Sequence, residues 1–102
     1  DLESAQHAKY RALAEHLDEV VFYEGRLPGL GADYLAEFEK VMGRVCATPE
    51  LYPRVGDSDL RKAGFKRFPL HVIYQVKLAQ ILVLAIAHQR RRPAYWAGRT
   101  GK

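Results

Sequence analysis

A short apolar run near the C-terminus constrains the fold more than any other feature. Residues 81–87 (ILVLAIA) are apolar without interruption and rich in β-branched side chains, which is typical of a strand buried on both faces. Polar and aromatic side chains follow at once, starting with His88 and continuing through residues 90–99. The pattern predicts a central strand that delivers these groups from a rigid element, where functional side chains are commonly held.

Two helices are predicted ahead of the strands. Apolar residues at three- and four-residue intervals, among them Leu13, Leu17 and Val20, predict an amphipathic helix from about Ala8 to the stop at Gly25. A second helix is expected to open near residue 31 and to end before the proline at residue 49. Its apolar stripe consists of Leu35, Phe38, Met42 and Val45, with Val41 alongside. Because the loop between the helices is short, we expect an antiparallel hairpin packed on one face of a sheet.

Two more strands are predicted between the helices and the apolar run. One covers Leu60–Lys66, and the other runs from Phe68 to Lys77, where apolar and polar residues alternate. Alternation with a period of two is typical of a half-buried strand.

Length and hydropathy indicate a small globular protein. The chain has 102 residues, which is enough for a single core, so we treat residues 1–102 as one domain. No stretch reaches the ~18 apolar residues of a membrane span. No basic-then-apolar signal segment opens the chain either. We therefore expect a cytoplasmic protein that has no membrane partner.

Charge is divided unevenly along the chain. Residues 1–60 hold six basic and twelve acidic residues, a net charge of −6. Residues 61–102 hold ten basic residues and no acidic one, a net charge of +10. This asymmetry predicts an acidic partner or a nucleic acid on the C-terminal half. A solvated sheet edge and basic tail without a partner is the alternative.

Histidines and the single cysteine do not form a recognisable catalytic or metal site. The four histidines lack metal-ligand spacing with carboxylates, and no Ser-His-Asp or Cys-His arrangement is present. Cys46 is alone, which excludes an intrachain disulfide and a Cys-based metal site, so we predict no cofactor. We expect His7 and His16 to face solvent and His71 to be a satisfied sheet-face histidine. His88 is the best acid–base candidate by position, although a structural role, bonded to a neighbouring carbonyl, fits equally well.

Residues 88–99 resemble the C-terminus of the RelE/ParE superfamily of toxins from bacterial type II toxin–antitoxin systems. The closest likeness is to the ParE-like branch, often labelled plasmid stabilisation proteins. Their last strand commonly ends in His-x-x-Arg-x-Pro-x-x-Trp-x-x-Arg, which falls here on His88, Arg91, Pro93, Trp96 and Arg99. Residues 22–31 (FYEGRLPGLG) and 67–74 (RFPLHVIY) agree as well. The resemblance covers residues 14–99.

This resemblance implies an α+β fold. An N-terminal helical hairpin packs on one face of a small, mainly antiparallel sheet of three to four strands, and a short C-terminal helix or tail follows. It also implies a cognate antitoxin, acidic and folding on binding, and growth inhibition by binding DNA gyrase without a catalytic residue set. Arg and Trp dominate interface energies. The residues expected to contact the partner or target are Arg67, His88, Arg90, Arg91, Arg92, Tyr95, Trp96 and Arg99.

The RelE branch of the same superfamily implies a different activity, cleavage of mRNA on the ribosome. Cationic side chains would stabilise the phosphorane-like charge, and a Tyr or His would move the proton of the 2′-OH. The residues available for this are Arg61, Lys62, Lys66, Arg67, His88, Arg91 and Tyr95. Two readings stay open beside it. In the first, a helix beginning at Pro93 folds Trp96 back over the sheet as a lid on the core. In the second, the whole chain is a non-toxic relative of the toxins and acts as a binding module.

The N-terminus departs from the ParE-like pattern, which begins with a strand at the sheet edge. Residues 1–11 (DLESAQHAKYR) contain no β-branched residue, and Leu2 and Tyr10 are their only large apolar side chains. Such a composition is a poor strand by propensity, so we expect helix here. A truncated or altered N-terminus, or a strand that tertiary contacts impose at the sheet edge, is the alternative. A missing strand would leave a sheet edge for another chain to fill, giving a homodimer or a higher toxin–antitoxin assembly.

Overall fold

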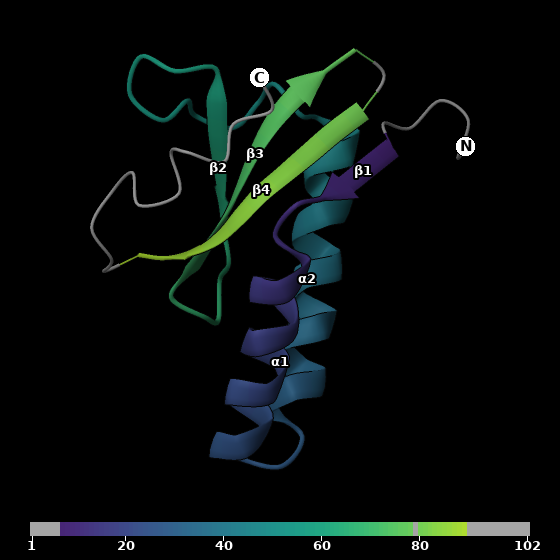
Figure 1. The fold of residues 1–102 in the computed structure, drawn as a ribbon, viewed down its shortest axis with the longest axis vertical. Helices are drawn as coiled ribbons and strands as arrows, with labels where there is room; N and C mark the ends of the chain where they lie inside the picture. The colour runs from purple at the N-terminus through teal and green to yellow at the C-terminus, as the bar shows by residue number, and fades with distance from the viewer. Residues whose placement is uncertain (1–6, 79, 90–102) are drawn as a thin grey trace.

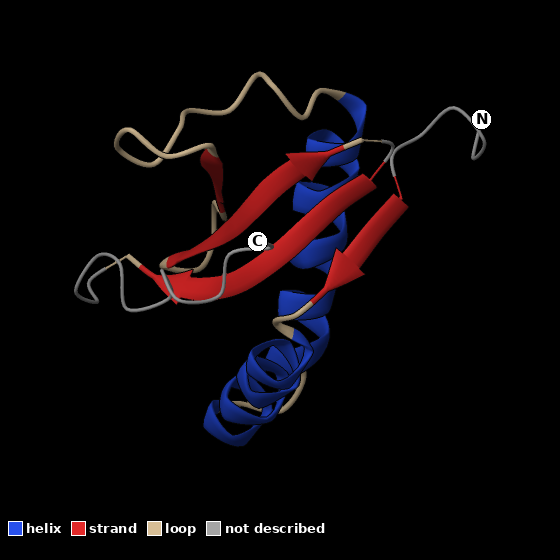
Figure 2. Ribbon diagram, turned by 45° about the horizontal axis from the view of Figure 1, so that its top comes forward, coloured by secondary structure: helices blue, strands red, loops and turns tan. Residues whose placement is uncertain are grey.

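The structure is a computed structural model that describes residues 7–78 and 80–89, with side chains from Tyr10 onward. Two helices and four strands follow one another along the chain (Figure 1). In order they are β1 (His7–Tyr10), α1 (Leu13–Arg26), α2 (Leu30–Ala47), β2 (Leu60–Gly64), β3 (Leu70–Lys77) and β4 (Gln80–His88). The strands form one sheet in the order β1-β4-β3-β2. Both helices lie against one face of it (Figure 2). The predicted α+β fold with a helical hairpin on a small sheet is confirmed.

β4 holds the inner position that its apolar run predicts. It pairs in parallel with β1 and antiparallel with β3, and Ile81 to Ala87 are all buried. β3 is more buried than its alternation predicted, because Ile73 and Gln75 on the face away from the helices are also covered. Gln75 satisfies its buried amide by donating from Nε2 to Asp59 Oδ2 at 3.0 Å.

The prediction of helix at the N-terminus is wrong for the residues that the structure describes. His7–Tyr10 form β1, and α1 begins only at Leu13. Four residue pairs join β1 to β4, and the Arg11 N–H continues the ladder by donating to the Val83 carbonyl at 2.9 Å. Pairing with an inner strand satisfies backbone groups that would otherwise be unbonded, which outweighs poor local propensity. The edge of β4 expected to await another chain is therefore occupied along its first half.

The turn between the helices depends on one carboxylate. Gly29 adopts a left-handed conformation (φ 92°) just before α2. Glu24 accepts hydrogen bonds from the N–H groups of Gly29 at 3.1 Å and Gly31 at 3.0 Å, which satisfies donors left open at the start of α2. A Cβ at Gly31 would lie 3.0 Å from the Val20 carbonyl oxygen, so the helices approach closely here.

Aromatic side chains form the centre of the core between the helices and the sheet. Tyr34 is fully buried and stacks on Phe65, with ring centroids 5.6 Å apart. Phe68 meets Tyr34 edge to face at 5.9 Å. The buried Glu37 accepts a hydrogen bond from the Lys66 N–H at 2.7 Å, which fixes the turn after β2 against α2.

α1 is rotated relative to the orientation that its apolar residues predict. Leu13 and Leu17, expected in the core, are 53% and 54% exposed. His16, expected to face solvent, is half-buried and shares a hydrogen bond with the Tyr34 hydroxyl at 2.9 Å. Since a buried hydroxyl needs a partner, the histidine takes the inward position and the leucines turn outward.

Candidate functional site

A β-bulge in β4 decides which face of the sheet His88 reaches. Ile73 pairs with Ala85 and Tyr74 pairs with Val83, so Leu84 is an extra residue in β4. Before the bulge, Ile81 and Val83 face the helices, and after it Ile86 does. The one-residue shift moves every later side chain to the opposite face. His88 therefore lies on the helix side of the sheet.

His88 is bonded to α1 at the end of β4. Its Nε2 lies 3.0 Å from Glu19 Oε2, and the side chains are 31% and 12% exposed. The other carboxylate oxygen of Glu19 is buried and has no hydrogen-bond partner among residues 7–78 and 80–89. One turn earlier, Glu15 accepts a hydrogen bond from the Ile86 N–H at 3.0 Å. Two acidic side chains of α1 thus fix the strand from which residues 90–99 leave.

The surroundings of His88 are aromatic and carry charges of both signs. His88 and Phe22 both line two hollows, of about 330 and 480 Å³. Arg26 stacks over the Phe22 ring at 5.5 Å. Burial raises the pKa of Tyr23, which lines the larger hollow, and the Glu19 charge raises it further. The Tyr23 hydroxyl therefore stays protonated at neutral pH. His88 and Glu19 form an imidazole–carboxylate pair beside it.

The other described residues of the predicted sites are not gathered around His88. Arg61 lies opposite Tyr74, and its Nη1 donates to the Tyr52 carbonyl at 2.6 Å, which holds the connector after α2. Arg67 lies nearer to His88, at the turn before β3, and forms an exposed ion pair with Asp33 at 3.4 Å. Residues Arg90, Arg91, Arg92, Tyr95, Trp96 and Arg99 lie outside the described residues.

Lys62 and His71 lie together on the face of the sheet that is turned away from the helices. Lys62 pairs with Ile73, a residue of the apolar cluster on that face, and His71 is two residues from Ile73 along β3. Gly64 lies opposite His71 and leaves room for the ring, since a Cβ there would be 3.4 Å from His71 Cδ2. Burial lowers the pKa of His71, and the Lys62 charge lowers it further. A neutral imidazole beside an ammonium group results. The alternation of side chains along β2 and β3 is the sequence signal that could have predicted a shared face for Lys62 and His71.

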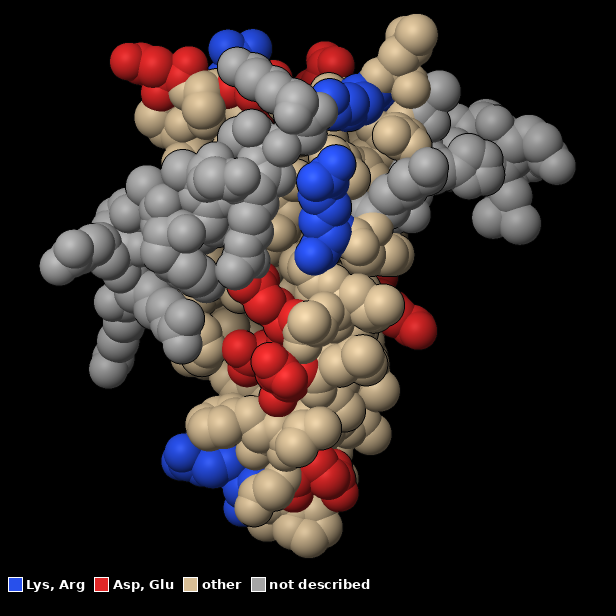
Figure 3. All heavy atoms as spheres, in the orientation of Figure 1, with Lys and Arg blue, Asp and Glu red and all other residues tan. Residues whose placement is uncertain are grey.

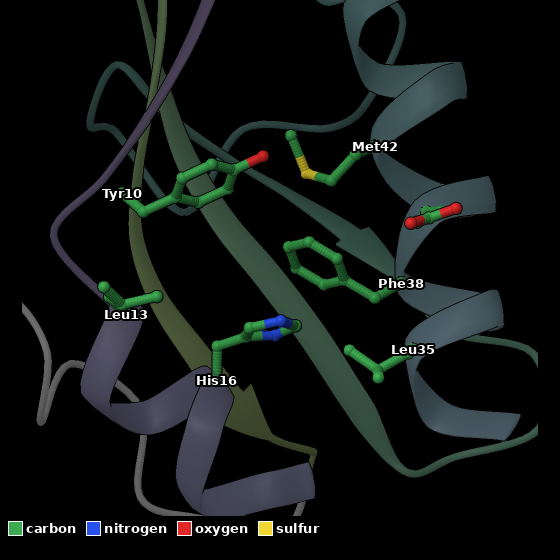
Figure 4. A pocket seen from close by; sticks show the side chains of 7 residues that line it. Tyr10, Leu13, His16, Leu35, Phe38 and Met42 are labelled. Carbon is green, nitrogen blue, oxygen red and sulfur yellow. The ribbon is translucent and has the colours of Figure 1, made fainter. Parts of the chain in front are cut away.

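An open groove runs between the start of α1 and α2 (Figure 4). It has a volume of about 370 Å³ and is lined by Tyr10, Leu13, His16, Leu35, Phe38, Glu39 and Met42. His16 packs against the Phe38 ring at 4.2 Å, and burial lowers the pKa of its imidazole. The groove is thus apolar around a neutral histidine, which suits binding of apolar side chains better than catalysis.

The described part of the chain holds neither a metal-ligand cluster nor a membrane-spanning helix. Among residues 7–78 and 80–89, no three His, Cys, Asp or Glu side chains gather as ligands for a metal ion. Neither helix in these ranges is long and apolar enough to cross a membrane.

The chain has structural relatives among solved proteins. The sequence matches no protein-family model, and no curated protein matches it significantly. A solved chain from the "Chromosomal ParDE TA system from P. aeruginosa" superposes with a TM-score of 0.67 over 81% of this chain and 95% of that one. The two chains share a fold. Their sequences are 18% identical, so the predicted resemblance to ParE-like toxins is supported at the level of this ParDE-like fold.

Proposed function

We propose that this chain is the toxin of a bacterial type II toxin–antitoxin system, that a cognate antitoxin neutralises it, and that it inhibits growth by binding DNA gyrase. The ParDE-like fold over 81% of the chain is the observation that carries the proposal. The His-x-x-Arg-x-Pro-x-x-Trp-x-x-Arg pattern of residues 88–99 favours the gyrase-binding branch. A target in the cytoplasm follows from this activity.

The charge distribution supports an acidic antitoxin. All ten charges of residues 61–102 are positive, and Lys and Arg side chains lie beside Asp and Glu side chains in the upper half of Figure 3. Arg67 is available to a partner, because its ion pair with Asp33 is exposed and such pairs hold weakly in water. An acidic segment that folds on this surface would gain charge-assisted hydrogen bonds as it becomes ordered.

His88 acts in this proposal as a positioning residue. Its bond to Glu19 fixes the end of β4 against α1, and Arg90, Arg91 and Arg92 follow this point in the sequence. These arginines, with Tyr95, Trp96, Arg99 and Arg67, form the proposed contact set for gyrase or antitoxin. Removal of Arg91 or Trp96 is then expected to weaken target binding without unfolding the described domain.

Induced expression without antitoxin tests the proposal in cells. Growth and a DNA-damage reporter are followed together for the natural chain, for Arg91→Ala and Trp96→Ala, and for Lys40→Ala on the exposed surface of α2 as the control. We expect arrest with damage signalling for the natural chain and for Lys40→Ala, and relief of both in the two tail variants. Normal growth of cells that contain soluble natural chain would contradict a toxic function. It would favour a non-toxic binding module.

Ribosome-dependent mRNA cleavage is the second candidate, favoured by the pair Lys62 and His71. A neutral imidazole can take the proton of a 2′-OH, and the neighbouring ammonium can stabilise the charge that develops on the phosphate. Arrest without damage signalling would turn the account toward this activity. Mapping of mRNA 5′ ends in a translation extract would then show cleavage by the natural chain, and loss of cleavage in His71→Gln and Lys62→Ala.

A further inference from the structure

α1 carries an apolar stripe on its outward side. Leu13, Leu17 and Val21 follow one another at four-residue spacing, which places them along one face of the helix. They are 53%, 54% and 72% exposed. Tyr10 at the end of β1 and Leu35 of α2 extend the apolar surface, with exposures of 43% and 39%. Uncharged side chains make up most of the surface over the helical hairpin in Figure 3.

The exposed apolar area of this face is in the range found at protein–protein interaction sites. Five large side chains at these exposures present on the order of 400 Å² of apolar surface, and patches of that size commonly mark interaction sites. A standard interface buries ~800 Å² on each partner, of which ~65% is apolar in homodimers. The stripe therefore supplies most of the about 520 Å² of apolar surface that each partner of such a dimer buries, and residues around it would supply the rest.

The stripe is arranged to match a second copy of itself. The groove between α1 and α2 includes Leu13 and lies at one end of the stripe, while Val21, its most exposed member, protrudes at the other end. Leu13 and Val21 are each four residues from Leu17. A two-fold axis through Leu17 would thus bring Val21 of each copy to the groove of the other, which is the reciprocal pairing of an isologous interface.

Most charges of the helical hairpin lie outside this contact, and Glu39 is the carboxylate residue that lines the groove. Among the described residues of α1, Asp18 and Glu19 line the hollow at His88, on the opposite flank of the helix from the groove. Glu24 is engaged by the N–H groups that follow α1. Antiparallel helices whose four-residue ridges interdigitate cross at about −50°, a common geometry for apolar helix contacts.

We propose that this face joins two copies of the chain, with α1 packed antiparallel to its counterpart about a two-fold axis at Leu17. Val21 of one copy enters the groove lined by Tyr10, Leu13 and Leu35 of the other. This assembly differs from filling of a sheet edge, since β1 occupies the first half of that edge. It concerns a surface separate from Lys62, Arg67 and the tail, and it does not depend on which target the chain inhibits.

Sedimentation velocity of the purified full chain from about 1 to about 200 µM tests the assembly. We expect a dimer at the upper concentrations. Leu17→Asp would place two carboxylates at the axis and weaken the dimer at least about tenfold. Leu51→Asp, at a 75% exposed position in the connector, is the matched control and should leave it unchanged. A monomer at every concentration would overturn the proposal and leave this face to a different protein, and a dimer that persists in Leu17→Asp would overturn it too.

Crosslinking locates the axis independently of stability. In a Cys46→Ser background, Leu17→Cys should form an intermolecular disulfide on mild oxidation, because symmetry places the two Cα atoms within the ~7 Å that a disulfide spans. Leu51→Cys in the same background should remain monomeric on non-reducing gels. Equal crosslinking of the two variants would contradict the proposed axis.

Discussion

Tyr34→Phe tests why α1 is rotated in this protein. The substitution removes only the hydroxyl that bonds His16 at 2.9 Å, in a side chain that is fully buried. A net hydrogen bond contributes ~0.5–1.5 kcal/mol, and the half-buried ring nitrogen of His16 loses its partner as well, so we expect a cost of about 1–2 kcal/mol. For a domain of this length that lowers Tm by about 4–16 °C.

Urea unfolding followed by circular dichroism measures the change directly. Tyr10→Phe is the matched control, because Tyr10 is 43% exposed and its hydroxyl remains accessible to water; we expect its unfolding free energy to stay within about 0.5 kcal/mol of the natural chain. A Tyr34→Phe cost no greater than that of Tyr10→Phe would refute the reasoning that the buried hydroxyl orients α1.

Three further predictions concern stability. Burial lowers the pKa values of His16 and His71, so the unfolded chain binds more protons near pH 6, and the unfolding free energy should fall as pH drops below about 6.5; urea melts at pH 7.5 and 5.5 measure this. Glu37→Ala should cost about 2–3 kcal/mol in the same melts, because a buried backbone N–H loses a carboxylate acceptor at 2.7 Å. Gly31→Ala should destabilise by about 1–3 kcal/mol, since its Cβ would meet atoms at 3.0 Å, whereas Gly25→Ala, with open space around its Cβ, should stabilise the helix by about 0.5–1 kcal/mol.

Each of these predictions has an outcome that contradicts it. Equal stability at the two pH values would show that the histidines titrate alike in the folded and unfolded chain. Glu39→Ala, at an exposed position two residues along α2, controls for loss of a carboxylate. An equal cost for Glu37→Ala and Glu39→Ala would exclude the role of the buried bond. An unfolding free energy of Gly31→Ala equal to that of Gly25→Ala would contradict close contact between the helices.

The elements whose signals are local were predictable from the sequence. The apolar run of residues 81–87 identified the inner strand, because burial on both faces leaves no place for polar side chains. The end of α2 follows from Pro49 and the turn before it from Gly29, whose backbone restrictions act at their own positions, whereas α1 continues past the stop predicted at Gly25 to Arg26. The placement of Lys62 and His71 on one face follows from strand alternation once the pairing of β2 with β3 is known.

The features that depend on distant contacts were not predictable. β1 forms against its own propensity because β4, about seventy residues later, offers a ladder of hydrogen bonds. The inward position of His16 on α1 is matched by a hydroxyl that α2 contributes 2.9 Å away. The bulge at Leu84 has no local sequence signal, yet it decides that His88 meets Glu19 rather than the face that carries His71.

A supercoiling assay with purified gyrase tests the proposed activity most directly. The natural chain, Arg91→Ala, Trp96→Ala and Lys40→Ala are titrated into gyrase with relaxed plasmid and ATP, and the products are separated on agarose gels. We expect loss of supercoiling with the natural chain and with Lys40→Ala. We expect at least about tenfold weaker inhibition by Arg91→Ala and Trp96→Ala. Full supercoiling at a large excess of folded natural chain would contradict the proposal that gyrase is the target.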